Sequence, residues 1–307
     1  MPKAFIFPGQ GSQYVGMGSD FYSKSEKVRK LYRSAEKILG YNLAKISFNG
    51  PENKLNQTEF TQPAIFVHSV IMDDYLKNTG TNPEAVAGHS LGEFSALVSA
   101  GVVSFEDALQ IIKVRSQSMA DAEQVSPGTM AAIMGINNKQ LKIICNQEGI
   151  VVPANINSPE QVVISGEIEA INNALITAKK LGIRKVIKLN VSGAFHSPLM
   201  QSAREPLKKV INSVNFNDTN TAIYQNVSPV ENFEGEKVKQ NLLKQLTSSV
   251  LWYDTIINME KNNIDTIIEV GPKQVLSKLV QKISPQIKTI SLDKLSDLVP
   301  NGFKINN

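Results

Sequence analysis

Short apolar runs alternate along this chain with longer segments in which apolar residues recur every three or four positions. The short runs have the length of buried β-strands and cover residues 3–7, 85–88 and 266–270. The longer segments have the period of α-helices and cover residues 60–76, 91–100 and 104–122. Gly101 occupies the usual position of a helix stop, and Ser104 with Asp107 forms a capping signal. The alternation predicts an α/β fold.

Residues 127–190 have a different rhythm from the chain on either side. Strand-like segments at 129–134, 151–155, 161–165 and 184–189 are interleaved with helical segments at 139–147 and 168–181. The turn signal Asn157-Ser158-Pro159 separates the second strand from the third. The order βαββαβ is typical of a ferredoxin-like unit. We therefore predict a ferredoxin-like subdomain at 127–190, inserted into a core of residues 1–126 and 191–307. After the insert we expect helices and one further strand, 266–270.

Composition narrows the class of protein only moderately. The 307 residues are 42% hydrophobic and 20% charged, which is ordinary for a globular protein with a large core. Cys145 is the only cysteine, so no internal disulfide is expected, and no apolar run has the length of a signal peptide or membrane span. The net charge of +4 is too mild to indicate a nucleic-acid partner. We expect a cytoplasmic protein that binds neither nucleic acid nor membrane.

A candidate nucleophile lies between an expected strand and an expected helix. Gly88-His89-Ser90-Leu91-Gly92 fits the pattern G-x-S-x-G. In that context the pattern predicts a nucleophile elbow, a sharp turn that exposes the serine hydroxyl. The N–H of Leu91 would then face a developing oxyanion. The alternative is a tight glycine turn without catalytic function.

Serine needs a base, and the chain has three histidines. His89 adjoins the candidate nucleophile, and consecutive side chains at an elbow rarely face one another. His68 lies in an apolar helical stretch, where a hydrogen-bonded core histidine is the commoner case. His196 lies in a turn-rich loop after the last strand of the insert, where catalytic bases are often found. We therefore predict that His196 is the base.

One arginine falls on an apolar helix face. Arg115 shares the stripe of Phe105, Ala108, Ile112 and Met119. A charge on a buried face is costly unless it is paired. A structural salt bridge or a side chain that reaches solvent would explain it, and so would a pocket for an anionic substrate group, which a guanidinium binds in bidentate fashion.

Several motifs spread over nearly the whole chain carry a family resemblance. They are FPGQGSQ at 7–13, VGMG at 15–18, GHSLGE at 88–93, PGTMAAI at 127–133, the stretch 155–166, GAFHS at 193–197, QLTSSVLW at 245–252 and EVGP at 269–272. In this order they resemble the malonyl-CoA:acyl carrier protein transacylases. Phe94, Ser116 and Lys273 replace residues more usual in the family, and none of them removes a proposed catalytic group.

The resemblance implies a role for each matching residue. Ser90 would carry the acyl group, His196 would be its base, and Arg115 would bind the malonyl carboxylate. Backbone N–H groups of Gln10 and Leu91 would form the oxyanion hole. Gln245 would orient the histidine through its backbone carbonyl, and Phe195 would crowd substituents on the malonyl group. The implied fold is an α/β-hydrolase-like core with a ferredoxin-like insert.

The implied activity is transfer of malonyl from malonyl-CoA, through a serine ester, to the thiol of acyl carrier protein in fatty acid synthesis. A ping-pong cycle of this kind needs no metal and no cofactor. We expect a monomer. A serine hydrolase, a loading enzyme of polyketide synthesis and a non-catalytic carrier-binding scaffold are the alternatives.

A basic cluster near the end of the insert is a candidate contact for the carrier or for coenzyme A. It consists of Lys179, Lys180, Arg184, Lys185 and Lys188. Arg184 and Lys185 are the strongest candidates because they lead into the loop of His196. An ordinary solvated basic face is the alternative.

Overall fold

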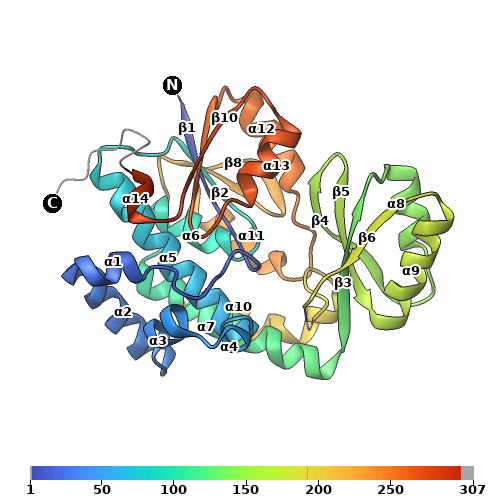
Figure 1. Ribbon diagram of the computed structural model, residues 1–307, viewed down its shortest axis with the longest axis horizontal. Helices are drawn as coiled ribbons and strands as arrows, with labels where there is room; N and C mark the ends of the chain where they lie inside the picture. Colours follow the sequence, from blue (N-terminus) through green and yellow to red (C-terminus); the bar gives the residue numbers. More distant parts are fainter. Residues whose placement is uncertain (1, 192, 299–307) are drawn as a thin grey trace.

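A computed structural model describes residues 2–191 and 193–298, in which helices and strands form a mixed α/β fold with two sheets (Figure 1). Residues 299–307 of the predicted core lie outside this description. The larger sheet has the strand order β10-β9-β1-β2-β7-β8. Its strands are β1 Lys3–Phe7, β2 Ala85–Gly88, β7 Ala222–Gln225, β8 Ser228–Asn232, β9 Thr266–Val270 and β10 Lys288–Leu292. The neighbouring strands β10, β9, β1, β2 and β7 run parallel to one another, and β8 pairs antiparallel with β7.

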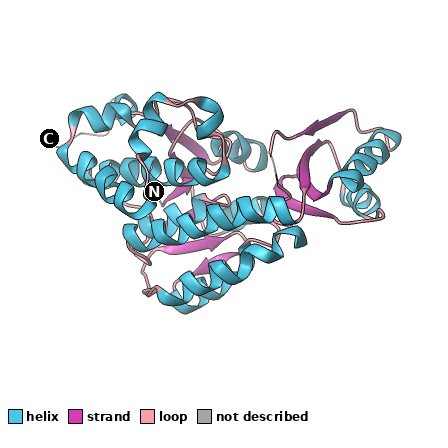
Figure 2. Cartoon of the chain, turned by 90° about the horizontal axis from the view of Figure 1, so that it is seen from below, coloured by secondary structure: helices cyan, strands magenta, loops and turns pink. Residues whose placement is uncertain are grey.

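The larger sheet is covered by helices on both faces. Successive side chains of a strand point to opposite sides, and in β1 both sets are apolar and buried. Phe5 and Phe7 of β1 join the core under α5 (Thr58–Asn78), α6 (Gly92–Ser99) and α7 (Phe105–Val125). Ala4 and Ile6 join the core under α12 (Trp252–Lys261) and α13 (Leu276–Ile283). Figure 2 shows the helices on either side of the strands. Both faces being apolar explains why the inner strands are continuous apolar runs.

The remaining helices surround this sheet. They are α1 Ser19–Lys24, α2 Glu26–Leu39, α3 Leu43–Asn49, α4 Glu52–Leu55, the 3₁₀ helix η1 Pro198–Ala203, α10 Arg204–Ser213, α11 Gly235–Gln245 and α14 Leu295–Leu298. Within the described ranges, no helix has both the length and the apolar character that crossing a membrane requires.

The smaller sheet is formed by the middle of the chain and lies to one side of the larger one (Figure 1). Its elements follow in the order β3 Gly128–Met134, α8 Asn138–Cys145, β4 Val151–Ser158, β5 Gln161–Glu167, α9 Ile168–Lys180 and β6 Lys185–Lys188. The strand order is β4-β5-β3-β6, and every pair is antiparallel. Both helices pack on one face, where Ile133, Ile164 and Ile171 are buried.

Backbone hydrogen bonds join the smaller sheet to the segment that precedes α12. Val250 donates to the carbonyl of Ala154 at 2.8 Å and accepts from the N–H of Ile156 at 2.9 Å. The segment before α12 therefore continues the edge of the smaller sheet next to β4.

Two expectations from the sequence were wrong in detail. The part of the chain after the insert contains β7, β8 and β10 in addition to β9. Asn157 and Ser158 belong to β4, so the turn is made by Pro159 and Glu160. Register shifts in the β4–β5 ladder let the strand continue past residues that usually end one.

Candidate active site

The turn between β2 and α6 is a sharp elbow that carries Ser90. Ser90 has a φ of 52°, in the left-handed region that is uncommon for residues other than glycine. A Cβ on Gly88 would lie 1.9 Å from the backbone carbon of Gly92, and a Cβ on Gly92 would lie 2.0 Å from the carbonyl oxygen of Phe7. Only glycine fits at both positions, so the turn can bring α6 against β1. The G-x-S-x-G pattern thus has a steric cause here.

His196 faces Ser90 from the loop before η1. Its Nε2 lies 2.8 Å from the Ser90 Oγ. Its Nδ1 lies 3.0 Å from the carbonyl oxygen of Gln245 and 3.1 Å from that of Ser248. Because carbonyl oxygens only accept, Nδ1 carries the proton and Nε2 is free to accept one from Ser90. Two backbone carbonyls therefore orient this histidine.

The electrostatic surroundings keep His196 neutral. Burial, and next the positive charge of Arg115, lower its pKa to about 3. The imidazole is 3% exposed, so water stabilises the imidazolium poorly. At neutral pH the side chain is in the form that can take a proton from Ser90.

Arg115 is buried beside the nucleophile. Its Nη1 donates to Gln62 Oε1 at 2.6 Å, and its Nη2 donates to Ser90 Oγ and to Gln245 Oε1, each at 3.1 Å. Burial lowers its pKa to about 10, which leaves it charged at neutral pH. Across residues 2–191 and 193–298 no carboxylate lies within ion-pair distance of it, and its Nε has no hydrogen-bond partner. The arrangement suits an incoming anion.

Gln245, at the end of α11, holds three groups of the site together. Its backbone carbonyl accepts from His196 and its side-chain oxygen accepts from Arg115. Its Nε2 donates to the Ser90 carbonyl oxygen at 3.0 Å. One residue thus fixes the positions of the base, the guanidinium and the elbow relative to one another.

The loop after β1 lies against the elbow. A Cβ on Gly9 would lie 2.5 Å from the carbonyl oxygen of His89 and 3.8 Å from the backbone nitrogen of Leu91. Gln10 is the next residue, and its side chain donates to Thr58 Oγ1 at 3.3 Å. None of the backbone hydrogen bonds between described residues uses the N–H of Gln10 or of Leu91. Both donors remain available to a ligand.

Among the described residues, the others of interest make no hydrogen bond to the Ser90 Oγ. Arg184 and Lys185 are exposed at and next to the start of β6, an edge strand of the smaller sheet. Phe195 is buried in the core, 7% exposed. His68 Nε2 lies 3.0 Å from Asp293 Oδ1, as expected for a hydrogen-bonded core histidine. His89 points to Asn157 Oδ1, 2.9 Å away, and not to the nucleophile.

Three buried polar residues of the site were not identified from the sequence. Gln62 holds Arg115, Asn226 contacts the elbow, and Glu93 contacts Asn226. Gln62 and Glu93 stand inside apolar helical stretches, and this was the signal that could have indicated them. Asn226 carries no such signal, because it follows a strand that the sequence did not predict.

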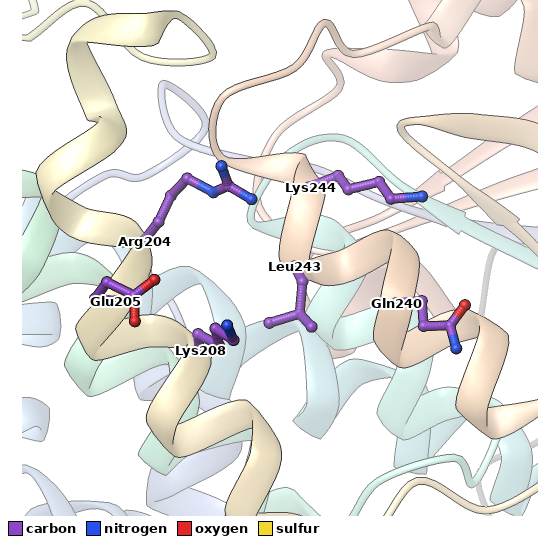
Figure 3. A pocket seen from close by; sticks show the side chains of 6 residues that line it. All are labelled: Arg204, Glu205, Lys208, Gln240, Leu243 and Lys244. Carbon is purple, nitrogen blue, oxygen red and sulfur yellow. The ribbon is translucent and has the colours of Figure 1, made fainter.

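A groove of about 350 Å³ lies between α10, which follows the His196 loop and η1, and α11, which ends at Gln245 (Figure 3). It is lined by Arg204, Glu205, Lys208, Gln240, Leu243 and Lys244. Figure 3 shows Arg204 reaching from α10 toward α11, whereas the side chain of Lys244 points away from α10. With three cations and one carboxylate, this surface is basic.

Comparison with known proteins agrees with this geometry. Residues 4–297 match the acyl transferase domain family. Malonyl CoA-acyl carrier protein transacylases of Staphylococcus aureus and Bacillus subtilis are each 39% identical, over 96% and 94% of this chain and 96% and 92% of theirs.

Solved structures extend the similarity to the whole fold. The malonyl-CoA:ACP transacylase of Synechocystis is 39% identical with a TM-score of 0.91, covering 98% of this chain and 100% of that one. A chain in the structure of a type II polyketide acyl carrier protein in complex with its malonyl-transacylase is 34% identical to this chain, with a TM-score of 0.93. The match covers 97% of this chain and 98% of that one. The chain therefore belongs to the acyl transferase family, among the relatives of the malonyl-CoA:acyl carrier protein transacylases.

Proposed function

We propose that this protein transfers the malonyl group of malonyl-CoA to the phosphopantetheine thiol of acyl carrier protein, through an ester on Ser90, in fatty acid synthesis. The observation that carries the proposal is the buried guanidinium of Arg115, which lies 3.1 Å from the Ser90 Oγ without a carboxylate partner among the described residues. The buried Glu93 acts on this charge electrostatically but makes no ion pair with it. A donor that carries a carboxylate next to its thioester supplies a direct partner.

In the first half of the cycle, the Ser90 Oγ attacks the thioester carbonyl while His196 Nε2 takes its proton. The N–H groups of Gln10 and Leu91 stabilise the oxyanion of the tetrahedral intermediate. The C–S bond then breaks, and the coenzyme A sulfur leaves with the proton from His196. A malonyl-serine ester remains, with its carboxylate on Arg115.

The second half reverses these steps with a different thiol. The phosphopantetheine thiol of the carrier gives its proton to His196 and attacks the ester carbonyl. The C–O bond breaks, Ser90 regains the proton from His196, and the malonyl thioester leaves on the carrier. The proton that Ser90 gives up to coenzyme A in the first half is replaced by the proton of the carrier thiol in the second, so Ser90 and His196 end the cycle in their starting protonation states. None of these steps requires a metal or cofactor.

We further infer that the fold consists of a catalytic core and an inserted subdomain. An α/β-hydrolase-like core of residues 1–126 and 191–307 would hold the catalytic residues, and residues 127–190 would be a ferredoxin-like insert. The βαββαβ order and the antiparallel strand order β4-β5-β3-β6 support the second assignment. Phe195 would limit substituents on the malonyl group, and Arg184 and Lys185 would contact the carrier or coenzyme A.

The test of the proposed function is the intact mass of the protein after it is mixed with malonyl-CoA. We expect one malonyl group on the wild type and none on Ser90→Ala. Addition of the phosphopantetheinylated carrier should move the malonyl group to the carrier thiol. Release of free malonate in place of transfer would indicate a hydrolase, and a protein that binds the carrier but never gains mass would be a scaffold.

A further inference from the structure

The side chain of Asn226 spans the nucleophile elbow from outside the motif. Its Oδ1 accepts from the backbone N–H of Ser90 at 2.7 Å, and its Nδ2 donates to the carbonyl oxygen of Gly88 at 2.6 Å. Asn226 directly follows β7 and is 2% exposed. One amide therefore bonds to the backbone on both sides of His89.

Asn226 is itself held firmly by its neighbours. Its backbone N–H donates to Glu93 Oε2 at 2.9 Å, and its carbonyl accepts from the N–H of Leu251 at 2.9 Å. The other oxygen of Glu93 accepts from Gln225 Nε2 at 3.0 Å. Glu93 lies in the first turn of α6 and is fully buried. The helix that follows the elbow thus fixes the residue that clamps the elbow.

This clamp acts on a backbone conformation that would not persist alone. Ser90 has a φ of 52°, and a side-chain-bearing residue stays in this region only when its surroundings over-determine it. The bond from Ser90 to Asn226 also uses the serine N–H. The N–H that remains at the elbow is that of Leu91, and its direction depends on the same turn.

We propose that Asn226 is a positioning residue for the nucleophile, which holds the Ser90 Oγ in line with His196, and that Glu93 positions Asn226. The proposal rests on the proposed role of Ser90 as nucleophile. Asn226 acts only through the elbow: its side chain bonds to the backbone of Ser90 and Gly88, and to neither His196 nor Arg115.

The experiment compares Asn226→Ala with Asn232→Ala. Asn232 is also buried, and its amide bonds only to the backbone of Glu234 in the next turn of chain, so it controls for the loss of a buried amide. The readouts are the rate at which a fluorophosphonate labels Ser90, kcat and KM for malonyl-CoA, and the unfolding midpoint. Labelling requires no acyl-CoA and reports the nucleophile directly.

We expect Asn226→Ala to lower the labelling rate and kcat about 10²-fold, the loss typical of a reacting group displaced by about 1 Å. KM for malonyl-CoA should change little, because Arg115 keeps its hydrogen bonds to Gln62 and Gln245. Asn232→Ala should keep both rates. A folded Asn226→Ala protein labelled at the wild-type rate would overturn the proposal, and so would equal slowing by Asn232→Ala.

Asn226→Asp gives a signature in the pH profile. A protonated aspartate can donate to Gly88 and accept from Ser90 as the amide does, whereas the carboxylate can only accept. The labelling rate of this variant relative to the wild type should therefore rise as pH falls. A ratio that is flat with pH would contradict a clamp that needs both bonds.

The contribution of Glu93 is tested by a double-mutant cycle. Glu93→Gln should slow labelling, and adding it to Asn226→Ala should cause clearly less than the sum of the two losses, because Glu93 holds Asn226, although it also interacts with Gln245 and Arg115. Additive losses would show that Glu93 acts by another route and would overturn the second half of the proposal. If the wild type is labelled by the fluorophosphonate and yet transfers no malonyl group, the proposed function fails while the positioning of Ser90 stands.

Discussion

The charge of Arg115 is the residue-level feature that should decide which acyl group is accepted. Among the described residues its hydrogen-bond acceptors are Gln62, Gln245 and Ser90, all uncharged. A buried donor left without its partner costs more than the bond gains when made. An acetyl group, which carries no carboxylate, therefore leaves the guanidinium in an unfavourable state.

We expect Arg115→Ala to lose malonyl transfer while acetyl transfer falls far less or rises. Loss of a buried charged pair typically costs about 2–5 kcal/mol, which corresponds to a preference for malonyl of at least tens-fold in the wild type. Competition between the two donors, expressed as the ratio of kcat/KM values, measures this. Arg115→Lys is the control, since it keeps the charge without the planar fork. An identical ratio in wild type and Arg115→Ala would make Arg115 a structural residue.

The depressed pKa of His196 makes a prediction about acid. In the unfolded chain this histidine takes up a proton below about pH 6.5, whereas in the folded protein it does so only near pH 3. Between these values the unfolded state binds more protons, so the free energy of unfolding falls as pH falls, by about 1.4 kcal/mol per pH unit from this group.

Denaturant unfolding of the wild type and of His196→Asn at pH 7 and pH 5 checks this linkage. The variant lacks the titrating group and should lose less stability on acidification. Ser90→Ala, which keeps the imidazole, serves as the control and should follow the wild type. Parallel curves for wild type and His196→Asn would mean that the folded protein does not hold the imidazole neutral.

The sequence indicates the three residues that lie together at the elbow better than it indicates the residues that hold them. Ser90, His196 and Arg115 stand out because a turn motif, a loop position and a charge on an apolar face are local signals. The clamp on Ser90 is not local, because Asn226 lies 136 positions further along the chain. Its function depends on which strand lies next to β2, and that is settled by packing of the whole sheet.

At the scale of elements, the close approach of α6 to β1 fixes the elbow. A Cβ at Gly92 would meet the carbonyl oxygens of Phe7 and Pro8 at 2.0 and 3.0 Å, and backbone atoms cannot move aside as side chains can. We expect Gly92→Ala to displace the start of α6, to cost about 1–3 kcal/mol of stability and to abolish labelling of Ser90.

Gly101→Ala is the matched control at the other end of α6. Gly101 has a φ of 74°, but a Cβ there would meet nothing within 4 Å. Its substitution should cost about 1 kcal/mol through backbone strain and leave Ser90 reactive. Calorimetry and labelling rates together separate loss of stability from loss of position, and a reactive Gly92→Ala protein would show that the turn tolerates the shift.

Strands with a continuous apolar pattern could be predicted, and the strands of mixed composition that follow the insert could not. The strands β1, β2 and β9 are buried on both faces and read as apolar runs. In contrast, β7 has the mixed sequence AIYQ, and β10, KTISL, is an edge strand whose side chains are mostly half-buried. Their pairing with neighbouring strands makes them part of the sheet, and that pairing leaves little trace in local composition.

At the scale of the whole molecule, two basic surfaces are candidates for contact with the carrier. Arg184 and Lys185 lie at the edge of the smaller sheet, and Arg204 and Lys244 lie at the groove between α10 and α11. Surface charges of this kind mainly steer association and are screened by salt.

Reversing Arg184 and Lys185 to glutamate should raise the KM for the carrier, most strongly at low ionic strength, with labelling of Ser90 unchanged. The matched pair Arg204→Glu and Lys244→Glu tests the groove in the same assay. A rise in KM with the second pair alone would place the carrier at the groove. If both double variants had the KM of the wild type at every ionic strength, both surfaces would be ordinary solvated faces.

Both members of the catalytic pair have left-handed backbones, with φ of 52° at Ser90 and 56° at His196. Each such residue costs about 1–2 kcal/mol, a cost that glycine avoids. Selection for stability alone would thus favour glycine at position 90, and Ser90→Gly should melt above Ser90→Ala. In a duplicated gene copy that no longer needs catalysis, Ser90 should therefore be among the first residues to be replaced. A related protein that keeps serine at this turn would therefore be one in which selection for catalysis has continued.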